Sequence, residues 1–524
     1  MTHKEEMYKV RNLKCINVYN CKEANQGGNA VAKFTFEEQP RLKLLSNEEI
    51  AKIHDQALCI LEKTGVKFDS GEALKILENH GASVDYPKKV AKIPGKLVEK
   101  AIKSAPEEIK LYDREGYLAA NLSGNNVYFD PGSCAIKMIE SDGITTRSSQ
   151  SHDLINISKV NDAMDNLALQ SSAVTPYDVP KVIGDSFRLY LLLKNSPKAI
   201  ITGAFSVEGI SKMRDMLAVV RGGYKELEDK PLAVFDICAS PPLKWTNISA
   251  QNIIDCARYG LPQEFITMAM PGAASPATLA GSVLVQVIET LSGLTLAQCT
   301  REGAPCIYGS APVTFDMRYG TTPMSALEAT MIGAAYVQMG KYYGLPTHTY
   351  AGLSDSKLVD IQAGLETAMS GIIAQLAGVN VISGAGILDF VGCFSLEKLV
   401  IDNEVCGMAL RLNKGIDVND ETLAAELISE LGPGGDYLLA DHTLRWFKRE
   451  PYLPSKIIVR QSNSAWEADG SKGSFALAQE RVRDILANHV PLQMKPAKEK
   501  ELDHVVKGLM KEHGIKEIPN GPNM

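Results

Sequence analysis

The sequence predicts an α/β fold, a (β/α)8 TIM barrel with helical additions before and after it. Eight short apolar runs follow one another along the middle of the chain, and segments with helical periodicity separate them. Near-continuous apolar strands that alternate with helices indicate a parallel sheet buried on both faces, and eight such units favour a closed barrel. The expected strands are 127–133, 168–176, 199–206, 232–240, 265–273, 306–314, 347–354 and 380–386.

One alternative fold gives a similar pattern. An open doubly wound sheet could hold the same number of strands. The first unit is also interrupted by an expected hairpin, CAIKMIESDGITT, at 134–146. We rank the barrel first because all eight units repeat the same strand-then-helix order.

The chain divides into four expected regions. Residues 1–41 form a polar N-terminal extension, 42–126 a helical N-terminal region, 127–390 the barrel, and 391–524 a helical C-terminal region with a tail. The second region opens with Ser46 and, three residues later, Glu49, which is the pattern of a capping box. The charged tail from Lys495 is expected to be frayed.

Composition excludes several classes of protein. The 524 residues carry 55 Lys and Arg against 62 Asp and Glu, so the net charge is −7, and phosphate binding needs clustered basic residues that the chain lacks. No uninterrupted apolar run is long enough to span a bilayer. The ten cysteines form no CxxC pair, and reduced core thiols are therefore expected in a cytoplasmic protein. No nucleic acid or membrane partner is expected.

The carboxyl ends of the strands are where a barrel carries its chemistry. Most of these ends hold an aromatic residue, although aromatics make up only 6% of the chain. Ring faces attract an organic cation, but the same rings could simply pack the barrel rim. A metal site built from His348, Cys134 and Cys238 lacks ligand spacing along any one element, so no metal is expected.

Two further functions stay open from the residues alone. Lys357, which closely follows the strand expected at 347–354, could form a Schiff base in a lyase or aldolase if it were desolvated. Its neighbours Asp355 and Asp360 favour a charged, paired lysine instead. The third possibility is a non-catalytic protein that binds a quaternary amine.

Several long motifs resemble one known family. They are TMAMPGAASPATLAG (267–281), YGSAPVTFDMRYGTTP (308–323), YAGLSDSKLVDIQAGLE (350–366) and GAGILDFVGCFSLEKLVIDNE (384–404), with GPGGDYLLADHTL at 432–444. From about residue 42 to 490 the chain resembles the trimethylamine methyltransferase superfamily of corrinoid-dependent methyltransferases. The resemblance implies a (β/α)8 barrel that moves a methyl group from a methylated amine to Co(I) of cobalamin on a separate small corrinoid protein.

One position departs from the family pattern. Archaeal trimethylamine enzymes carry pyrrolysine just before the Ser-Asp of this loop, whereas here the residue is Leu353. Non-pyrrolysine members include enzymes that demethylate glycine betaine and other quaternary amines. The resemblance therefore implies a corrinoid-dependent methyltransferase for a quaternary amine, which works with a corrinoid partner and binds no cobalamin tightly itself. We also expect a homo-oligomer.

The resemblance and the strand ends together suggest a substrate pocket. We expect aromatic rings to form a cage, Leu353 to line the space where pyrrolysine would lie, and His348 or Arg318 to bind a betaine carboxylate. Asp316, Asp355 and Glu366 are motif carboxylates that we expect either to be partly paired within the protein or to bind polar parts of the substrate. The expected cage rings are Phe129, Phe315, Tyr350 and Phe390.

Overall fold

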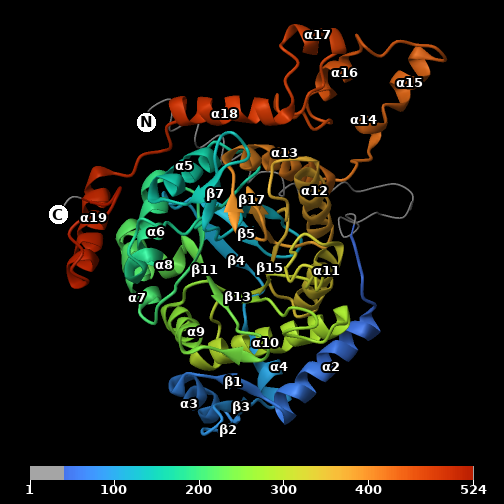
Figure 1. The fold of residues 1–524 in the computed structure, drawn as a ribbon. Helices are drawn as coiled ribbons and strands as arrows, with labels where there is room; N and C mark the ends of the chain where they lie inside the picture. Colours follow the sequence, from blue (N-terminus) through green and yellow to red (C-terminus); the bar gives the residue numbers. More distant parts are fainter. Residues whose placement is uncertain (1–40, 523–524) are drawn as a thin grey trace.

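A nearly closed barrel of eight parallel strands forms the centre of the computed structural model, which describes residues 41–522 (Figure 1). The strand order is β6-β16-β15-β14-β13-β11-β10-β9, and the two ends of this sheet meet where Ala168 N donates to Phe129 O at 2.9 Å. Seven expected strands contain one of these eight, and the expected strand 265–273 overlaps β13, which begins two residues earlier, so the barrel prediction is confirmed. The strands are β6 (Tyr128–Pro131), β9 (Gln170–Ser171), β10 (Ile200–Gly203), β11 (Ala233–Cys238), β13 (Gln263–Thr267), β14 (Cys306–Ser310), β15 (Thr347–Tyr350) and β16 (Val381–Ala385).

A ring of helices surrounds the barrel (Figure 1). One of them, α10, has the length and hydropathy of a membrane span, but 72% of its apolar window is buried against the rest of the protein. It therefore serves as a core helix here. The helices are α5 (Ser151–Asp162), α6 (Gly184–Asn195), α7 (Gly209–Arg221), α8 (Tyr224–Asp229), α9 (Asn247–Tyr259), α10 (Leu279–Thr300), α11 (Leu327–Tyr342), α12 (Ile361–Leu376) and α13 (Leu396–Asn413), with a 3-10 turn, η2 (Lys181–Ile183).

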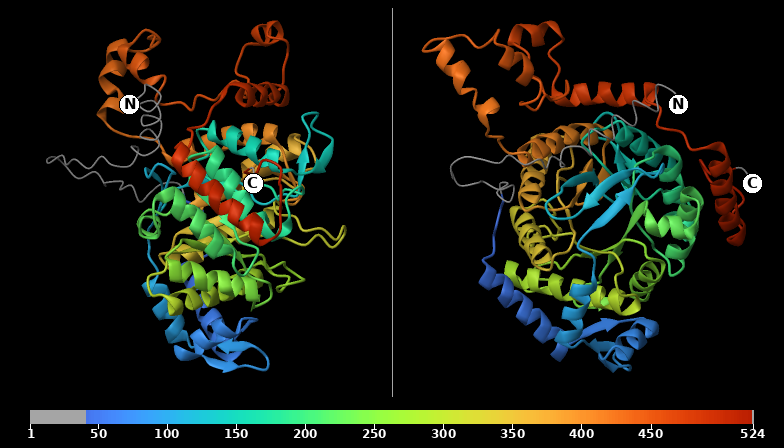
Figure 2. Two further views of the ribbon diagram at one scale, coloured as in Figure 1. Left: turned by 90° about the vertical axis from the view of Figure 1, so that its left-hand side faces the viewer. Right: turned by 180° about the vertical axis from the view of Figure 1, so that it is seen from behind.

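A hairpin closes the amino-terminal end of the barrel. Strands β4 (Ile109–Tyr112) and β5 (Leu118–Leu122) lie across that end (Figure 2, right). Their apolar side chains pack with lumen-facing residues of the barrel, including Val234, Ile307 and Val381. Because this end is filled, a ligand must enter from the opposite end, which we call the mouth.

The N-terminal region contains the predicted helices and a small sheet that the sequence patterns did not reveal. Helix α2 (Asn47–Lys63) begins with the expected capping box between Ser46 and Glu49. It is followed by α3 (Gly71–Asn79) and α4 (Gly95–Ser104). The sheet has the order β12-β1-β3-β2, and its strands are β1 (Val66–Phe68), β2 (Ser83–Asp85), β3 (Val90–Lys92) and β12 (Lys244–Trp245). The expected extension at 1–41 lies outside the described residues apart from residue 41.

A second small sheet stands at the mouth. The hairpin expected at 134–146 is present as β7 (Lys137–Ile139) and β8 (Thr146–Ser148). It joins β17 (Ile387–Leu388) and β18 (Cys393–Phe394) in the order β17-β18-β7-β8.

The C-terminal region first leaves the barrel and then returns to it (Figure 1). Helices α14 (Asp420–Leu423), α15 (Ala425–Leu431), α16 (Asp441–Trp446) and α17 (Asn463–Ala468) project outward, and α18 (Ser474–Asn488) returns to α5 and α13. The prediction of a frayed tail from Lys495 is wrong. Residues 496–512 form helix α19 (Pro496–Glu512), which packs on α6 and α7 and buries Leu502, Val506 and Met510.

Candidate functional site

The strand register places a layer of polar side chains inside the barrel. Paired residues of neighbouring strands share one face of the sheet, and Asp130 pairs with Ser383 while Asp236 pairs with Glu264. Ser383 Oγ donates to Asp130 Oδ1 at 2.5 Å and lies 2.7 Å from His348 Nε2. His348 Nδ1 lies 3.5 Å from Glu264 Oε2, and Glu264 and Asp236 are register partners whose carboxyl groups influence each other electrostatically. These five side chains, which we call the acid layer, form one connected chain across the lumen.

The acid layer carries little net charge. Burial, and then the neighbouring Asp236, raise the pKa of Glu264 well above its usual range, and burial also raises the pKa of Asp130. Burial raises the pKa of Asp236 to about 6, although the interaction with Glu264 and the positive charge of Arg188 both lower it. Burial lowers the pKa of His348 to about 3. His348 is therefore neutral at pH 7, burial favours the neutral form of Glu264, and Asp236 is the member of the layer that carries a negative charge.

Solvent reaches the lumen at the mouth end of the barrel. Tyr350 lies two residues after His348 on β15, its hydroxyl lies 2.8 Å from Ser133 Oγ, and its ring meets that of His348 edge to face at 5.3 Å between centroids. Cys238 is paired with Ile266 on the lumen side of the register and is exposed. We call the solvent-accessible mouth end of the lumen the recess.

Arg188 lies at the edge of this recess. Its side chain is buried, Nη1 donates to Ser172 O at 3.3 Å, and the guanidinium lies 4.6 Å from the ring centroid of Phe205. Within residues 41–522, its Nε and Nη2 atoms are buried without a hydrogen-bond partner. Phe205, which covers the guanidinium, is 54% exposed, so a change in this one side chain would uncover a cation with two free donors.

Two of the motif carboxylates join loops at the mouth. Asp355 accepts hydrogen bonds from the backbone N–H groups of Met324, at 3.1 Å, and Ser325, at 2.8 Å. Burial raises its pKa to about 6. Glu366 accepts from Ser354 Oγ at 2.6 Å and from the Asp355 N–H at 2.8 Å. This geometry is the internal pairing that was expected of these two residues.

The third motif carboxylate and the candidate arginine bind each other. Arg318 donates from Nε to Asp316 Oδ1 at 3.0 Å and from Nη2 to Oδ2 at 2.6 Å. This pair lowers the pKa of Asp316 to about 2, and the Arg318 side chain is 80% exposed. Arg318 is thus already occupied by an internal carboxylate. Phe315, which precedes the pair, is half-buried in the same loop.

The expected cage residues do not all face the recess. In the strand register Phe129 pairs with Ile382, and the residues before and after it in β6 occupy lumen-facing positions. Phe129 itself is buried in the large core cluster, to which the surrounding helices also contribute. Its ring therefore points away from the lumen. Tyr350 faces the lumen, Leu353 is buried beside the mouth loops, and Phe390 is half-buried after β17.

Lys357 and Phe390 are in direct contact. The Lys357 ammonium lies 3.7 Å from the Phe390 ring centroid and 3.4 Å from Asp389 Oδ1. Its side chain is 59% exposed. A Schiff-base lysine is expected to be desolvated, and Lys357 has the surroundings of an ordinary charged lysine.

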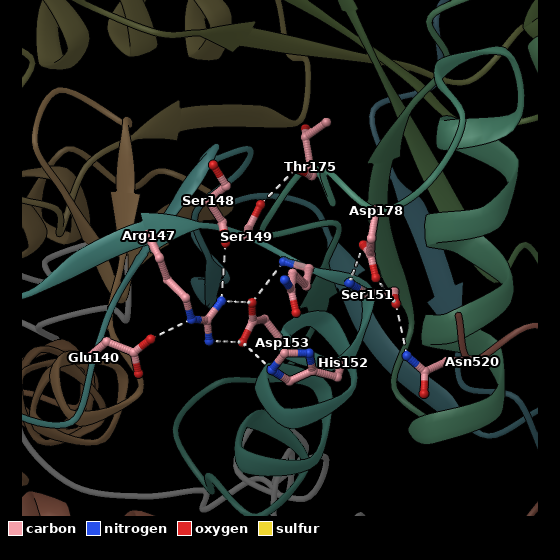
Figure 3. A network of polar contacts seen from close by, with 11 residues as sticks. Glu140, Arg147, Ser148, Ser149, Ser151, His152, Asp153, Thr175, Asp178 and Asn520 are labelled. Carbon is pink, nitrogen blue, oxygen red and sulfur yellow. Dashed lines mark hydrogen bonds and ion pairs between the residues drawn. The ribbon is translucent and has the colours of Figure 1, made fainter. Parts of the chain in front are cut away.

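A polar network fixes the edge of the mouth near the β7–β8 hairpin (Figure 3). Arg147 on β8 makes two hydrogen bonds to Asp153 on α5, at 2.6 and 2.8 Å, and also pairs with Glu140. Ser151 binds Asp178 in the loop after β9 and accepts a hydrogen bond from Asn520. The hairpin, the helix start and the loop after β9 are thus held together.

Sequence reasoning missed most of the acid layer and Arg188. Asp130 and Asp236 stand near strand ends and could be noticed there, but Glu264 lies just before the strand expected at 265–273 and Arg188 lies inside a helix. The available signal was an acidic residue directly before an apolar run, since an acidic residue is rarely buried without a partner. No group of three His, Cys, Asp or Glu side chains that could hold a metal ion occurs within residues 41–522.

Comparisons with known proteins identify the family and agree with this fold. A family model described as trimethylamine methyltransferase matches residues 19–514. The chain is 34% identical to trimethylamine methyltransferase MttB of Desulfitobacterium hafniense strain DCB-2, over 90% of this chain and 94% of that protein. It is 32% identical to a glycine betaine methyltransferase of strain Y51, over 91% and 98% of the two chains.

A solved structure supports the fold alone. The hydroxylamine complex of MtmB aligns with a TM-score of 0.50 at 11% identity, covering 84% of this chain and 87% of that one. The protein is thus a methyltransferase enzyme built on a (β/α)8 barrel. More particularly, the chain belongs to the trimethylamine methyltransferase family.

Proposed function

We propose that this enzyme transfers a methyl group from a quaternary amine of the betaine type to Co(I) of a cobalamin carried by a separate corrinoid protein. The observation that carries the proposal is Leu353, whose side chain is only 1% exposed. The trimethylamine enzymes that this chain resembles carry pyrrolysine at the same position of the loop. The similarity to a glycine betaine methyltransferase supports the same substrate class.

Leucine changes what the site can activate. A hydrocarbon side chain offers neither an electrophilic carbon nor a hydrogen-bond donor, so it cannot form an adduct with a tertiary amine. A quaternary nitrogen already carries its positive charge, and its leaving group departs as a neutral amine. The substrate itself thus supplies the activation that Leu353 cannot provide.

The low charge of the acid layer suits such a reaction. A fully ionised cluster would stabilise the cationic substrate more than a transition state in which charge is being cancelled, which would slow the reaction. Burial raises the pKa of Asp130 and of Glu264, which favours the neutral, protonated form of both carboxyl groups. The single charge on Asp236 can attract the substrate without holding it strongly.

The chemical step is a direct displacement. The N–CH3 bond breaks with its electron pair going to nitrogen, and the Co(I) electron pair forms the new bond to carbon, so that cobalt becomes Co(III). The protein's contribution is to place the N–CH3 bond in line with cobalt, an effect worth up to roughly 7 to 11 kcal/mol when the geometry is fixed. We propose that Tyr350, Phe315 and Phe390 hold the cation.

We assign the carboxylate of a betaine substrate to Arg188. Arg318 already binds Asp316, and His348 is neutral and bonded to Ser383. Arg188 instead retains two N–H groups without a partner in the described chain, and guanidinium binds a carboxylate in a two-pronged geometry. Movement of Phe205 would open this contact.

The corrinoid partner is assigned to the rim of the mouth. Large apolar side chains are exposed on the loops and helix starts there, and contiguous apolar surface of this kind marks a protein-binding face. We propose that cobalamin stays on the partner and that both proteins act in a reducing compartment, since the eight described cysteines are free. The rim residues are Tyr177, Phe205, Met268, Met317, Tyr319, Leu358, Ile361 and Leu365.

The proposal is tested by supplying reduced cobalamin and a panel of methylated amines. We expect methyl-Co(III) absorbance to develop with at least one quaternary amine, such as glycine betaine, proline betaine, carnitine or γ-butyrobetaine. Trimethylamine should give no more than the rate without enzyme. Transfer from trimethylamine alone would overturn the quaternary assignment while leaving the methyltransferase class intact.

A further inference from the structure

A surface cavity of about 470 Å³ lies away from the mouth, beside the turn of the β4–β5 hairpin that closes the opposite end of the barrel. Three segments that are far apart in the sequence form its walls: the hairpin turn, the end of α7 with α8, and the start of α19. Figure 2, left, shows α19 (red) lying across the green helices of the barrel. The volume is within the range of about 300 to 1,000 Å³ that small-molecule sites occupy.

The fold gathers basic side chains that no single stretch of the sequence shows together. The whole chain carries a net charge of −7, yet the lining of this cavity holds five basic side chains against the three acidic ones of Glu115, Glu226 and Asp229. The five, which define what we call the basic cavity, are Arg114, Arg221, Lys230, Lys495 and Lys498.

Two of the three acidic side chains are already bound to cations. Glu115 pairs with Arg114 at 3.4 Å, and Asp229 pairs at 2.8 Å with Lys225, which lies outside the lining. Within residues 41–522, Glu226 is the one lining carboxylate outside an ion pair. The internal carboxylates therefore do not balance the cations of the basic cavity.

Arg221, Lys230 and Lys495 are the cations with capacity for a further anion. Arg221 Nη2 donates to Tyr112 O at 3.3 Å, and Arg221 Nε is buried without a hydrogen-bond partner in residues 41–522. Lys230 Nζ lies 3.4 Å from Gly116 O and 5.5 Å from the centroid of the Tyr112 ring, both uncharged partners. Neither lysine forms an ion pair with a residue that the structure describes. A Cβ built on Gly116 would lie 3.4 Å from Arg221 Nη1 and 3.9 Å from Lys230 Nζ, so these two cations converge on one backbone position.

The partial burial of Arg221 favours an anion at this point. Burial lowers the pKa of Arg221, although the nearby carboxyl groups of Asp113 and Glu115 raise it. A guanidinium that has lost part of its hydration interacts more strongly with an opposite charge than an exposed one does. Its planar fork of N–H groups also matches the oxygens of a phosphate group.

We propose that the basic cavity binds a small molecule that carries a phosphate or diphosphate group. Phosphate oxygens point in several directions, so one group can accept from Arg221 and Lys230 on one wall while Lys495 approaches from the other. A carboxylate has only two oxygens in one plane and suits such a divided set of cations less well. Val220 and Met494, which also line the cavity, offer apolar surface to the organic part of the molecule.

The test is isothermal titration calorimetry of the full chain with ADP and with inorganic pyrophosphate as probes. We expect saturable binding of one molecule per chain. Lys230→Gln/Lys495→Gln removes an exposed cation from each of two walls and should weaken binding by roughly tenfold or more, because charge-assisted hydrogen bonds are lost. The matched control is Lys67→Gln/Lys89→Gln, which removes two exposed lysines beside Asp69 in the N-terminal sheet. It makes the same change in net charge and should bind as the wild type does.

Thermal unfolding provides a second readout. A ligand that binds only the folded chain raises Tm, so ADP should raise Tm of the wild type and of the control variant but not of Lys230→Gln/Lys495→Gln. Tighter binding of ADP than of pyrophosphate would support the apolar wall as the site of the organic part, and equal affinity would support the diphosphate as the recognised group. No saturable binding of either probe at millimolar concentration, or equal weakening in the two double variants, would overturn the proposal. Because substrate and cobalamin are both left out, the result is independent of the proposed methyl transfer.

Discussion

The ammonium group of Lys357 lies 3.7 Å from the centroid of the Phe390 ring. A ring proposed to bind the substrate cation thus already holds a cation of the protein. Asp389 Oδ1, at 3.4 Å, and the Asp355 carbonyl oxygen, at 2.7 Å, keep the ammonium there. The substrate must therefore either displace Lys357 from this ring or bind beside it.

Replacing Lys357 with methionine should favour the substrate. We expect Lys357→Met to lower KM for a quaternary amine by about two- to fivefold, because a cation–π contact of about 0.5 to 1 kcal/mol no longer competes. Steady-state kinetics would show this. Lys110→Met is the matched control, since Lys110 pairs with Glu108 at 2.9 Å on β4, away from the mouth. An unchanged KM would remove Phe390 from the cage, and a complete loss of turnover would revive a Schiff-base role.

Tyr350 should contribute through its ring rather than its hydroxyl. We expect Tyr350→Leu to lower kcat/KM by roughly tenfold to thirtyfold, which corresponds to the loss of a desolvated cation–π contact of up to about 2 kcal/mol. Tyr350→Phe should be close to wild type, because it loses only the hydrogen bond to Ser133. Phe129→Leu is the control: it should reduce thermal stability but leave KM unchanged, since that ring faces the helices. Wild-type kinetics in Tyr350→Leu would contradict the cage.

Arg188 should distinguish substrates that carry a carboxylate from those that do not. We expect Arg188→Lys to raise KM for a betaine at least tenfold, because a charge-assisted hydrogen bond is worth about 1.5 to 3 kcal/mol. KM for tetramethylammonium should stay within about twofold, which also shows that the variant is folded. Arg318→Lys is the matched control, since its guanidinium binds Asp316. If Arg318→Lys produced the selective effect instead, the carboxylate site would lie on the loop after β14.

His348 should make the folded protein less stable at acidic pH. Its pKa is lowered to about 3 in the folded protein, whereas an unfolded histidine titrates near 6.5. Between these values only the unfolded chain binds the proton, so stability falls as the pH falls below about 6.5. Asp236, with a pKa raised to about 6, has the opposite effect on stability between about pH 4 and pH 6. Both proteins in the comparison below contain Asp236, so its effect is common to them.

The comparison is between wild type and His348→Gln in urea unfolding at pH 7, 6 and 5. We expect the wild type to lose stability relative to the variant by about 1.4 kcal/mol per pH unit below 6.5. Two profiles that stay parallel would show that His348 takes up a proton in the folded state.

The barrel could be predicted from the sequence because its strands lie in eight short runs that are rich in apolar residues. The same property hid the orientation of individual residues. In a strand buried on both faces, Phe129 and Asp130 look alike as core positions, and only the pairing with β16 shows that Asp130 faces the lumen. The contact between Lys357 and Phe390 joins two loops and has no sequence signal. The outward projection of α14, α15 and α16 was also not recognisable, because the apolar residues of these helices have the spacing of ordinary core helices.

Methyl transfer from the quaternary amine to cobalt is the central step of the proposed function. One measurement quantifies both of its products, the methyl-cobalt species and the tertiary amine. The enzyme is mixed with cob(I)alamin and with glycine betaine that carries labelled methyl groups. The methyl-Co(III) absorbance and the amount of tertiary amine are then quantified together. The same measurement is made with each of the other betaines in the panel. We predict that one tertiary amine forms for each methyl-cobalt with at least one betaine. The account would be contradicted if every quaternary amine left both products at the level of the enzyme-free control while trimethylamine was consumed.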